Sequence, residues 1–170
     1  MINQTAYELG SNRSCIRDLF EYGRAFLSWA EEVSKKHPEL VMENCGSGGM
    51  RIDYAMLSRY HLQSMTDASN YHAIAQISAA SPTAVIPEQA AIWSCPKEED
   101  NKTNVIGHMT NSLMQRMHLS GAITTMSPES FALMTEAVKC YKQIRKYLPG
   151  STSVRSRPSI IGISAERIAL

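Results

Sequence analysis

The chain has 170 residues, of which 44% are hydrophobic and 19% charged, a composition typical of one soluble globular domain with an apolar core. Its 17 lysines and arginines nearly balance 16 acidic residues, and neither sign forms a long block, which excludes nucleic acid and membrane surfaces as expected partners. No apolar run approaches the roughly 20 residues that a membrane span requires, and no secretory signal is visible.

The four cysteines are widely spaced along the chain: Cys15, Cys45, Cys95 and Cys140. They contain no CxxC pair and do not form the framework of a small disulfide-stapled protein. We therefore expect buried, reduced thiols in a cytoplasmic protein rather than disulfides.

The first predicted element is a long amphipathic helix that begins after residue 12 and ends near Lys36. Its apolar residues recur at three- and four-residue steps, which predicts one face packed on a core. Seven residues form this face: Ile16, Leu19, Phe20, Phe26, Leu27, Ala30 and Val33. Pro38 stops the helix, and residues 40–44 predict a buried strand that leads into a glycine-rich loop.

The same order of elements then repeats. Residues 53–60 predict a short helical piece, residues 62–66 a strand, and residues 70–80 a helix that ends before Pro82. Helix and strand therefore alternate at a spacing typical of βα units.

The next stretch of the chain is patterned less clearly. Apolar runs at residues 84–86 and 90–93 lie on either side of Pro87, and the sequence alone leaves open which of them is the strand. A polar insert at residues 97–102 leads into a predicted helix that ends near His118.

The last predicted helix has a well-marked start. A short apolar piece at residues 121–123 precedes Ser127 and Pro128, which are typical N-cap and first-turn residues. Its core stripe is expected to contain Phe131, Met134, Val138, Tyr141, Ile144 and Leu148.

Strands that alternate with helices at this spacing predict an α/β fold with a parallel sheet, either doubly wound or part of a (β/α)₈ barrel. Four βα units can be counted, whereas a complete barrel takes about 250 residues. We therefore expect residues 1–149 to form about half of a barrel. Residues 150–170, which are rich in serine and arginine, are expected to be a linker and a divergent tail.

One window carries the strongest chemical signal. Glycine-rich residues 45–49 follow the predicted strand, Arg51 and Asp53 follow them, and Asp67 stands at the end of the next strand. Glycine lets backbone N–H groups approach a ligand closely, and barrel enzymes place their chemistry at the carboxyl ends of strands. A glycine-rich turn on its own is weak evidence, because such turns are common in ordinary loops.

The combination is more specific. The pattern Cys-x-Ser-Gly-Gly-x-Arg-x-Asp-x-x-Met-Leu, followed by the aspartate at the end of the next strand, resembles the signature of glycoside hydrolase family 36. The resemblance includes residues 37–40 before the motif and residues 87–93 after it, and covers most of residues 1–148. It implies the C-terminal half of a TIM-barrel catalytic domain in an α-galactosidase or a raffinose or stachyose synthase.

The resemblance also implies roles for single residues. Asp67 falls at the position of the general acid/base, which protonates the leaving oxygen and later deprotonates water. Cys45, Gly48 and Gly49 fall where members of the family contact galactose. Arg51 and Asp53 are expected to form an ion pair that braces the loop.

Each candidate has a plainer structural interpretation. Asp67 could be only the cap of the helix at residues 70–80, Cys45 a buried thiol, and Trp93 a packing residue rather than a sugar platform. The histidines show no ligand spacing such as HExxH, and surface or capping roles are expected for four of them: His61, His72, His108 and His118. No metal and no cofactor are expected.

A retaining glycosidase needs a nucleophile as well as an acid/base. In the family the nucleophile is the aspartate of a Lys-x-Asp motif, and that position aligns at or just before Met1. Asp18, the first aspartate present, lies in the long predicted helix and is a poor substitute.

We therefore expect an α-galactosidase fragment that is inactive alone and whose substrates are galactoside oligosaccharides of the melibiose and raffinose type. One alternative is a non-catalytic half-barrel that completes a separately encoded N-terminal half or pairs with a second copy. Another alternative is galactosyl transfer to sugar acceptors, as in raffinose and stachyose synthases.

Overall fold

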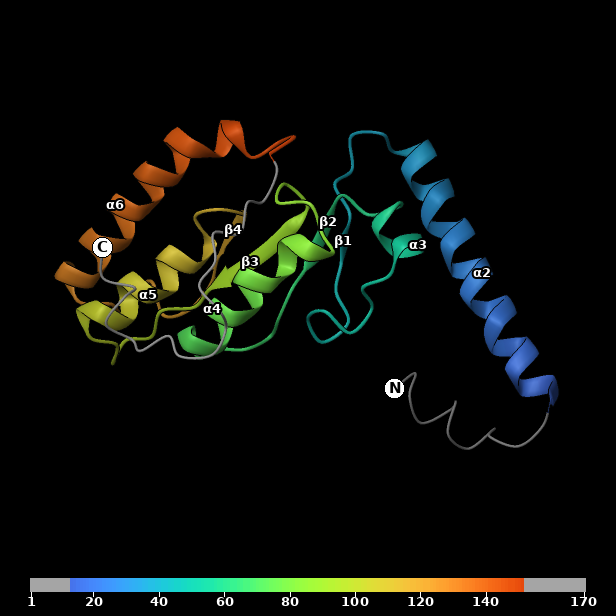
Figure 1. The fold of residues 1–170 in the computed structure, drawn as a ribbon, viewed down its shortest axis with the longest axis horizontal. Coiled ribbons are helices and arrows are strands. Elements are labelled where there is room, and N and C mark those ends of the chain that lie inside the picture. Colours follow the sequence, from blue (N-terminus) through green and yellow to red (C-terminus); the bar gives the residue numbers. More distant parts are fainter. Residues whose placement is uncertain (1–12, 152–170) are drawn as a thin grey trace.

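A computed structural model describes residues 13–151 of the chain, and the side chains of residues 17–151 (Figure 1). The four strands are β1 (Glu43–Asn44), β2 (Leu62–Ser64), β3 (Ala90–Ser94) and β4 (Arg116–Leu119). The helices are α2 (Arg13–Lys36), α3 (Tyr54–Leu57), α4 (Tyr71–Ala80), α5 (Lys102–Ser112) and α6 (Pro128–Ile144), with 3₁₀ turns η1 (Ser81–Thr83) and η2 (Arg145–Tyr147). The predicted tail at residues 152–170 lies outside the described residues.

The strands form one parallel sheet in the order β1-β2-β3-β4. A helix stands between each pair of consecutive strands, so each strand lies beside its predecessor after a crossover. This arrangement confirms the predicted α/β class. Because all strands run in the same direction, the segments that follow β1 and β2 meet at one edge of the sheet.

The three longer helices that follow β2 begin where a side chain caps them. The Asn70 side chain accepts hydrogen bonds from the backbone N–H groups of His72 and Ala73 at the start of α4. Asn101 does the same for α5, and Ser127 caps α6 as predicted. These caps satisfy N–H groups that have no partner within the helix, which fixes where each helix starts.

The apolar core lies between the sheet and helices α4, α5 and α6. Ile74 of α4 packs with Ala90 and Ile92 of β3 in one cluster. Val105 and Met109 of α5 pack with Met134 of α6 in a second cluster. Helices α4, α5 and α6 therefore follow one another around the sheet as neighbours (Figure 1).

The structure settles one strand that the sequence left open and corrects the prediction of another. The run at residues 90–93 forms β3, while residues 84–86 lie in the connection before it. Helix α5 ends at Ser112 instead of near His118, and the fourth strand is Arg116–Leu119 instead of residues 121–123. This strand was missed because four residues are too few to establish a period, and its backbone pairing with β3 decides its conformation.

The predicted core stripe of the last helix is partly wrong. Met134 and Leu148 are buried as expected, but the Phe131 side chain at the start of α6 is 49% exposed. Phe131 lies in the first turn, next to Glu129, which forms an ion pair with Lys102 of α5.

Helix α2 departs furthest from expectation. Among the side chains described, residues 17–151, Ala30 alone of the predicted core face is buried, whereas Leu19 and Phe20 are 55% and 63% exposed. The side chain of Ile16 lies outside the described residues. The helix lies at the end of the molecule away from α5 and α6 (Figure 1). Its carboxylate Glu31 lies 3.7 Å from Arg59, a surface ion pair that contributes little stability. Within residues 13–151 the apolar face of α2 thus stays largely exposed.

Candidate active site

The glycine-rich loop begins where β1 ends. The Gly46 N–H donates to the Gly48 carbonyl (3.3 Å), and the Ile52 N–H donates to the Gly49 carbonyl (3.2 Å). Ser47 and Gly48 have φ angles of 52° and 70°, in the left-handed region that glycine adopts without steric cost. The loop is therefore a tight, internally hydrogen-bonded turn rather than an extended linker.

This loop packs against the backbone that follows β2. A Cβ atom on Gly48 would stand 2.6 Å from the Thr66 Cα and 2.8 Å from the Asp67 nitrogen. A Cβ atom on Gly49 would stand 3.0 Å from the Met65 carbonyl oxygen. Such a close approach of two backbones requires glycine, because any side chain would push them apart. The structure thus brings Gly48 and Gly49 directly against the segment that carries Asp67.

Two buried side-chain amides, those of Asn44 and Gln63, connect the glycine-rich loop to strands β1 and β2 by hydrogen bonds. Asn44 Nδ2 donates to the Arg51 carbonyl (3.0 Å) and to Gln63 Oε1 (2.6 Å). Gln63 Nε2 in turn donates to the carbonyls of Ser64 (2.7 Å) and Asn44 (3.3 Å). The Gln63 side chain is fully buried, so these hydrogen bonds are shielded from water and costly to leave unmade. Sequence reasoning missed this pair, although a glutamine inside an otherwise buried strand was a usable signal.

Asp67 itself is exposed, and its side chain makes no hydrogen bond or ion pair with any residue of the described part of the chain. The plainer interpretation of Asp67 as a helix cap is wrong, because Asn70 caps α4. The backbone on both sides of Asp67 is held by Thr66, whose Oγ1 accepts a hydrogen bond from the Ala68 N–H (2.9 Å). The Asp67 carboxylate is therefore free to face a ligand.

The expected ion pair between Arg51 and Asp53 is absent from residues 13–151. The Asp53 carboxylate instead accepts a hydrogen bond from the Met56 N–H (2.8 Å) and caps α3. The Arg51 side chain packs over Gly46, where a Cβ atom would stand 2.7 Å from its Cγ. Spacing alone could not reveal this, because the start of α3 competes for the same carboxylate.

Two expectations about cysteines are corrected. Cys45, in the glycine-rich loop, and Cys140, on α6, are exposed free thiols instead of buried ones. Cys95 is partly buried, and burial raises the pKa of its thiol while the Ser120 side chain opposes part of that shift. The side chain of Cys15 lies outside the described residues.

A polar and aromatic group lines the other face of the sheet, away from the helices. Trp93 Nε1 donates to Ser64 Oγ (2.9 Å), and the Trp93 ring meets the His118 ring edge-on with centroids 4.9 Å apart. His118 Nδ1 lies 3.9 Å from the Glu43 carboxylate. Burial lowers the pKa of His118, and the Glu43 carboxylate opposes part of that shift. His118 is therefore a partly buried residue, which corrects the expectation of a surface or capping role.

The contact between Glu43 and His118 also reports the shape of the sheet. Glu43 is on β1 and His118 on β4, at opposite edges. Neighbouring strands lie about 4.8 Å apart, so three steps across a flat sheet would separate them by about 14 Å. A side-chain separation of 3.9 Å requires a sheet curved toward this face. Such curvature is the geometry of a closing barrel, with the polar group in its interior.

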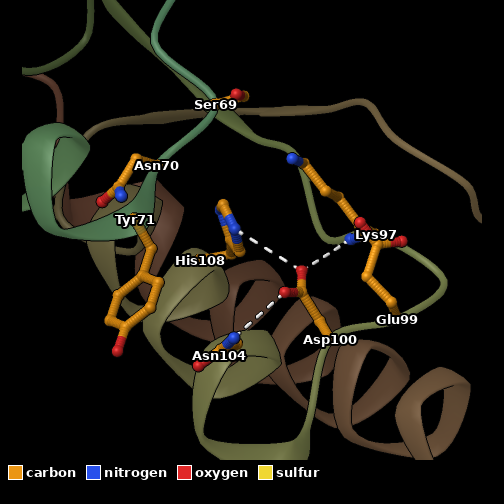
Figure 2. A pocket seen from close by; sticks show the side chains of 8 residues that line it. All are labelled: Ser69, Asn70, Tyr71, Lys97, Glu99, Asp100, Asn104 and His108. Carbon is orange, nitrogen blue, oxygen red and sulfur yellow. Dashed lines mark hydrogen bonds and ion pairs between the residues drawn. The ribbon is translucent and has the colours of Figure 1, made fainter.

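His108 is the second histidine that departs from expectation. It is 2% exposed, and its Nε2 lies 3.7 Å from the Asp100 carboxylate (Figure 2). Burial lowers the pKa of His108, which Asp100 opposes in part and Lys97 reinforces. His61 and His72 remain exposed, as predicted.

Two further negative findings concern the described residues. Between residues 13 and 151, no cluster of three or more His, Cys, Asp or Glu side chains has a geometry that could hold a metal ion. No helix of this part of the chain is long and apolar enough to cross a membrane.

Comparison with known proteins decides the family. Residues 2–149 match the Melibiase family, which is nearly nine-tenths of the sequence. The chain belongs to the melibiase family. This melibiase-family chain has no match among curated protein sequences.

Solved structures agree on the fold. The chain resembles the α-galactosidase from Lactobacillus brevis, the galactosidase domain of the α-galactosidase-sucrose kinase AgaSK, and the family 36 α-galactosidase AgaA from Geobacillus stearothermophilus. The TM-scores are 0.63, 0.63 and 0.64, each at 16% identity, over 71%, 71% and 72% of this chain. The matched region spans 17%, 17% and 18% of those proteins, so the chain corresponds to a small part of their length. The curved parallel sheet is thus a partial (β/α)₈ barrel.

Proposed function

We propose that this chain is the acid/base-bearing part of the catalytic barrel of a retaining α-galactosidase that removes terminal α-galactose from melibiose- and raffinose-type oligosaccharides. The observation that carries the proposal is the packing of Gly48 against the backbone of Thr66 and Asp67. This packing holds the loop proposed to contact galactose beside the carboxylate proposed to act on the glycosidic bond. Membership of the melibiase family supports the same assignment.

In this proposal Asp67 performs both proton transfers. It protonates the glycosidic oxygen as the bond to the leaving group breaks, and it then deprotonates the water that releases galactose. Its position after β2 and its exposed carboxylate suit this task, because within residues 17–151 no neighbouring group has to be displaced first.

The glycine-rich loop would bind the galactose ring. The exposed Cys45 thiol and the backbone at Gly48 and Gly49 are the proposed contacts. The left-handed turn at Ser47 and Gly48 orients the loop backbone rigidly, and the Asn44 and Gln63 amides keep it in place. A pre-organised loop loses little entropy on binding, and its hydrogen bonds can strengthen in the transition state.

The nucleophile must come from another part of the barrel. Retention requires a second carboxyl group about 5–5.5 Å from the acid/base. The position where the family carries its nucleophile aligns with the start of the chain, outside the described residues. Asp18, the first aspartate of the chain, is an exposed residue of α2 and does not supply this group. We therefore propose that residues 13–151 by themselves do not form a complete site.

The open edges of the sheet support a partner for the half-barrel. Both β1 and β4 lie at edges, and the apolar face of α2 is largely uncovered within residues 13–151. Unpaired strand edges favour pairing with further strands. Those strands could belong to the same polypeptide, to a separately encoded N-terminal half or to a second copy of the chain. Size-exclusion chromatography with and without an N-terminal half distinguishes pairing with that half from pairing with a second copy.

The exposed, unpaired thiols of Cys45 and Cys140 favour a reducing compartment, because such thiols oxidise elsewhere. We therefore propose that the protein acts in the cytoplasm.

The proposal is tested by activity in a complete barrel. The chain is joined to the N-terminal half of a family member, and hydrolysis of melibiose and of nitrophenyl α-galactoside is measured for the parent, Asp67→Asn and Asp53→Asn. Loss of a general acid costs about 10²–10⁴-fold, and the loss is greatest when the leaving group is a poor one. We expect Asp67→Asn to reduce melibiose turnover far more than nitrophenyl galactoside cleavage.

Asp53→Asn is the matched control, because it removes an exposed carboxylate near the same loop but only weakens a helix cap. Equal loss in both variants would contradict the assignment of Asp67. The chain alone is expected to release no nitrophenol. Turnover by the chain alone that Asp67→Asn abolishes would show that it is self-sufficient.

A further inference from the structure

A pocket lies at the edge of the sheet where the strands begin, opposite the edge that carries Asp67. Its lining comes from the turn before β3, the first residue of β4, and the end of α6 with η2. Its volume is about 480 Å³, within the range of small-molecule sites. The five residues of β3 span about 15 Å between the two edges of the sheet, so this pocket is separate from the proposed galactose site.

Positive charge gathers around this pocket. Four of its lining side chains are cationic and exposed: Arg116, Lys142, Arg145 and Lys146. None of the four forms an ion pair with any of residues 17–151. The whole chain has a formal net charge of only +1, so this excess of positive charge belongs to the pocket and not to the protein in general.

Glu88, the one acidic residue of the lining, offsets only part of this charge. One oxygen of its carboxylate accepts a hydrogen bond from the Gly150 N–H (3.2 Å), and the other is buried without a hydrogen-bond partner within the described residues. Four positive charges and one negative charge leave the lining with a net charge of +3. The pocket therefore favours an anion with more than one negative charge.

The end of a helix explains only some of these cations. Cations near a helix C-terminus interact favourably with its dipole, which accounts for Lys142 and Arg145 singly. However, Lys142 stands three and four residues before Arg145 and Lys146, and like charges at that spacing on a helix repel each other. Arg116 begins β4, so no helix end accounts for it. An anion bound among these side chains would relieve their repulsion.

Two donors are held in position beside these charges. Arg116 Nε donates to the Glu88 carbonyl (3.0 Å), which orients the guanidinium and leaves its two Nη groups without a partner among residues 17–151. The Tyr141 hydroxyl accepts a hydrogen bond from the Met117 N–H (3.2 Å), so its own proton remains available to a ligand. A planar guanidinium with two available N–H groups binds two oxygens of a phosphate at once, and such charge-assisted hydrogen bonds are strong.

We propose that this pocket binds the phosphate group of a small phosphorylated molecule. A phosphate monoester carries about 1.5–2 negative charges at neutral pH and three acceptor oxygens. Arg116 would bind two of these oxygens, Tyr141 would donate to the third, and Lys142, Arg145 and Lys146 would supply the remaining positive charge. A volume of about 480 Å³ leaves room for an organic group beside the phosphate. The inference does not rest on the proposed function, because the glycine-rich loop and Asp67 take no part in it.

The test uses the full chain labelled with ¹⁵N at pH 7.5 in 0.15 M sodium chloride, which screens exposed charges more than about 8 Å apart. The chain is titrated separately with D-glucose 6-phosphate, sodium phosphate and D-glucose. Glucose 6-phosphate is expected to shift the amide signals of Arg116, Arg145 and Lys146, whereas glucose should leave them unchanged. Shifts with either phosphate compound support the site, and the tighter of the two shows whether the ligand is an ester or free phosphate.

Variants of the lining show which groups bind the phosphate. Arg116→Met should weaken binding about tenfold, as expected for loss of a charged hydrogen bond, and Arg116→Lys should recover only part of it because lysine lacks the planar fork. Lys142→Met should weaken binding about two- to fivefold. Lys139→Met is its matched control, because Lys139 is also an exposed lysine of α6 but pairs with Glu136 outside the pocket. All these side chains are exposed, and the amide spectrum of each variant verifies that it is folded.

Four results would overturn the proposal. The first is the absence of shifts with both phosphate compounds. The second is equal weakening by Lys142→Met and Lys139→Met, because it would show attraction to the surface charge as a whole. The third is binding of a hexaglutamate peptide without binding of either phosphate compound, which would indicate an acidic protein segment as the partner. The fourth is competition by D-galactose, because the galactose site is proposed at the other edge of the sheet.

Discussion

Replacing Gly48 by alanine tests how the active-site loop is assembled. Two costs are expected. A φ of 70° strains any residue with a Cβ by about 1–2 kcal/mol, offset by about 0.4–1 kcal/mol because alanine restricts the unfolded chain. The new methyl group would also stand 2.6 Å from the Thr66 Cα, and overpacking of this kind costs about 1–3 kcal/mol. Together they predict a loss of about 1–5 kcal/mol in the free energy of unfolding.

Gly150→Ala provides the matched comparison. Gly150 has a φ of 72°, but a Cβ there would meet no atom within 4 Å. This variant therefore carries the backbone strain alone, about 1 kcal/mol or less after the offset. Both are measured by urea unfolding followed by circular dichroism, with the slope checked for constancy. If Gly48→Ala costs no more than Gly150→Ala, the loop does not pack against the Asp67 segment as described.

Three further predictions follow from particular residues. Gly23→Ala adds a methyl group in α2 where nothing lies within 4 Å, so far-UV circular dichroism should show higher helix content, with a gain of up to about 1 kcal/mol. Asn70→Ala removes the cap of α4 and should lower the free energy of unfolding by about 1 kcal/mol, whereas Asn70→Asp should retain most of it. The pKa values of His108 and His118 are lowered in the folded chain, so the unfolded chain binds more protons just below pH 6.5. The free energy of unfolding should be at its full value above that pH and decline as the pH falls toward the folded pKa values. Urea titrations at pH 7.5 and pH 5 measure this decline, and it should be smaller in the variant His118→Gln.

The family resemblance was readable because it depends on short stretches of sequence. The motif from Cys45 to Leu57 and the aspartate at position 67 identified the family, which the match over residues 2–149 confirms. The same residues implied that the loop and Asp67 serve one site, and the structure places Gly48 against Asp67. The roles of Asp67, Cys45, Gly48 and Gly49 in catalysis and binding stay predictions.

The pairs that depend on contact between distant residues could not be predicted. Asn44 with Gln63 and Glu43 with His118 are joined only when strands far apart in sequence lie in one curved sheet. The ion pair expected between Arg51 and Asp53 failed for a related reason. Two residues close in sequence were assumed to interact, but the start of α3 offered the Asp53 carboxylate a backbone donor.

The sequence by itself determined the α/β class, the starts of α4 and α6, and the family, because helix caps, apolar periodicity and a family motif act over a few neighbouring residues. Only the tertiary structure decided that Arg116–Leu119 is a strand, that His108 is buried and His118 partly buried, and that the apolar face of α2 is left largely uncovered within residues 17–151. Those properties depend on which surfaces meet. A strand at a sheet edge takes its conformation from its neighbour, and burial is a property of packing rather than of residue type.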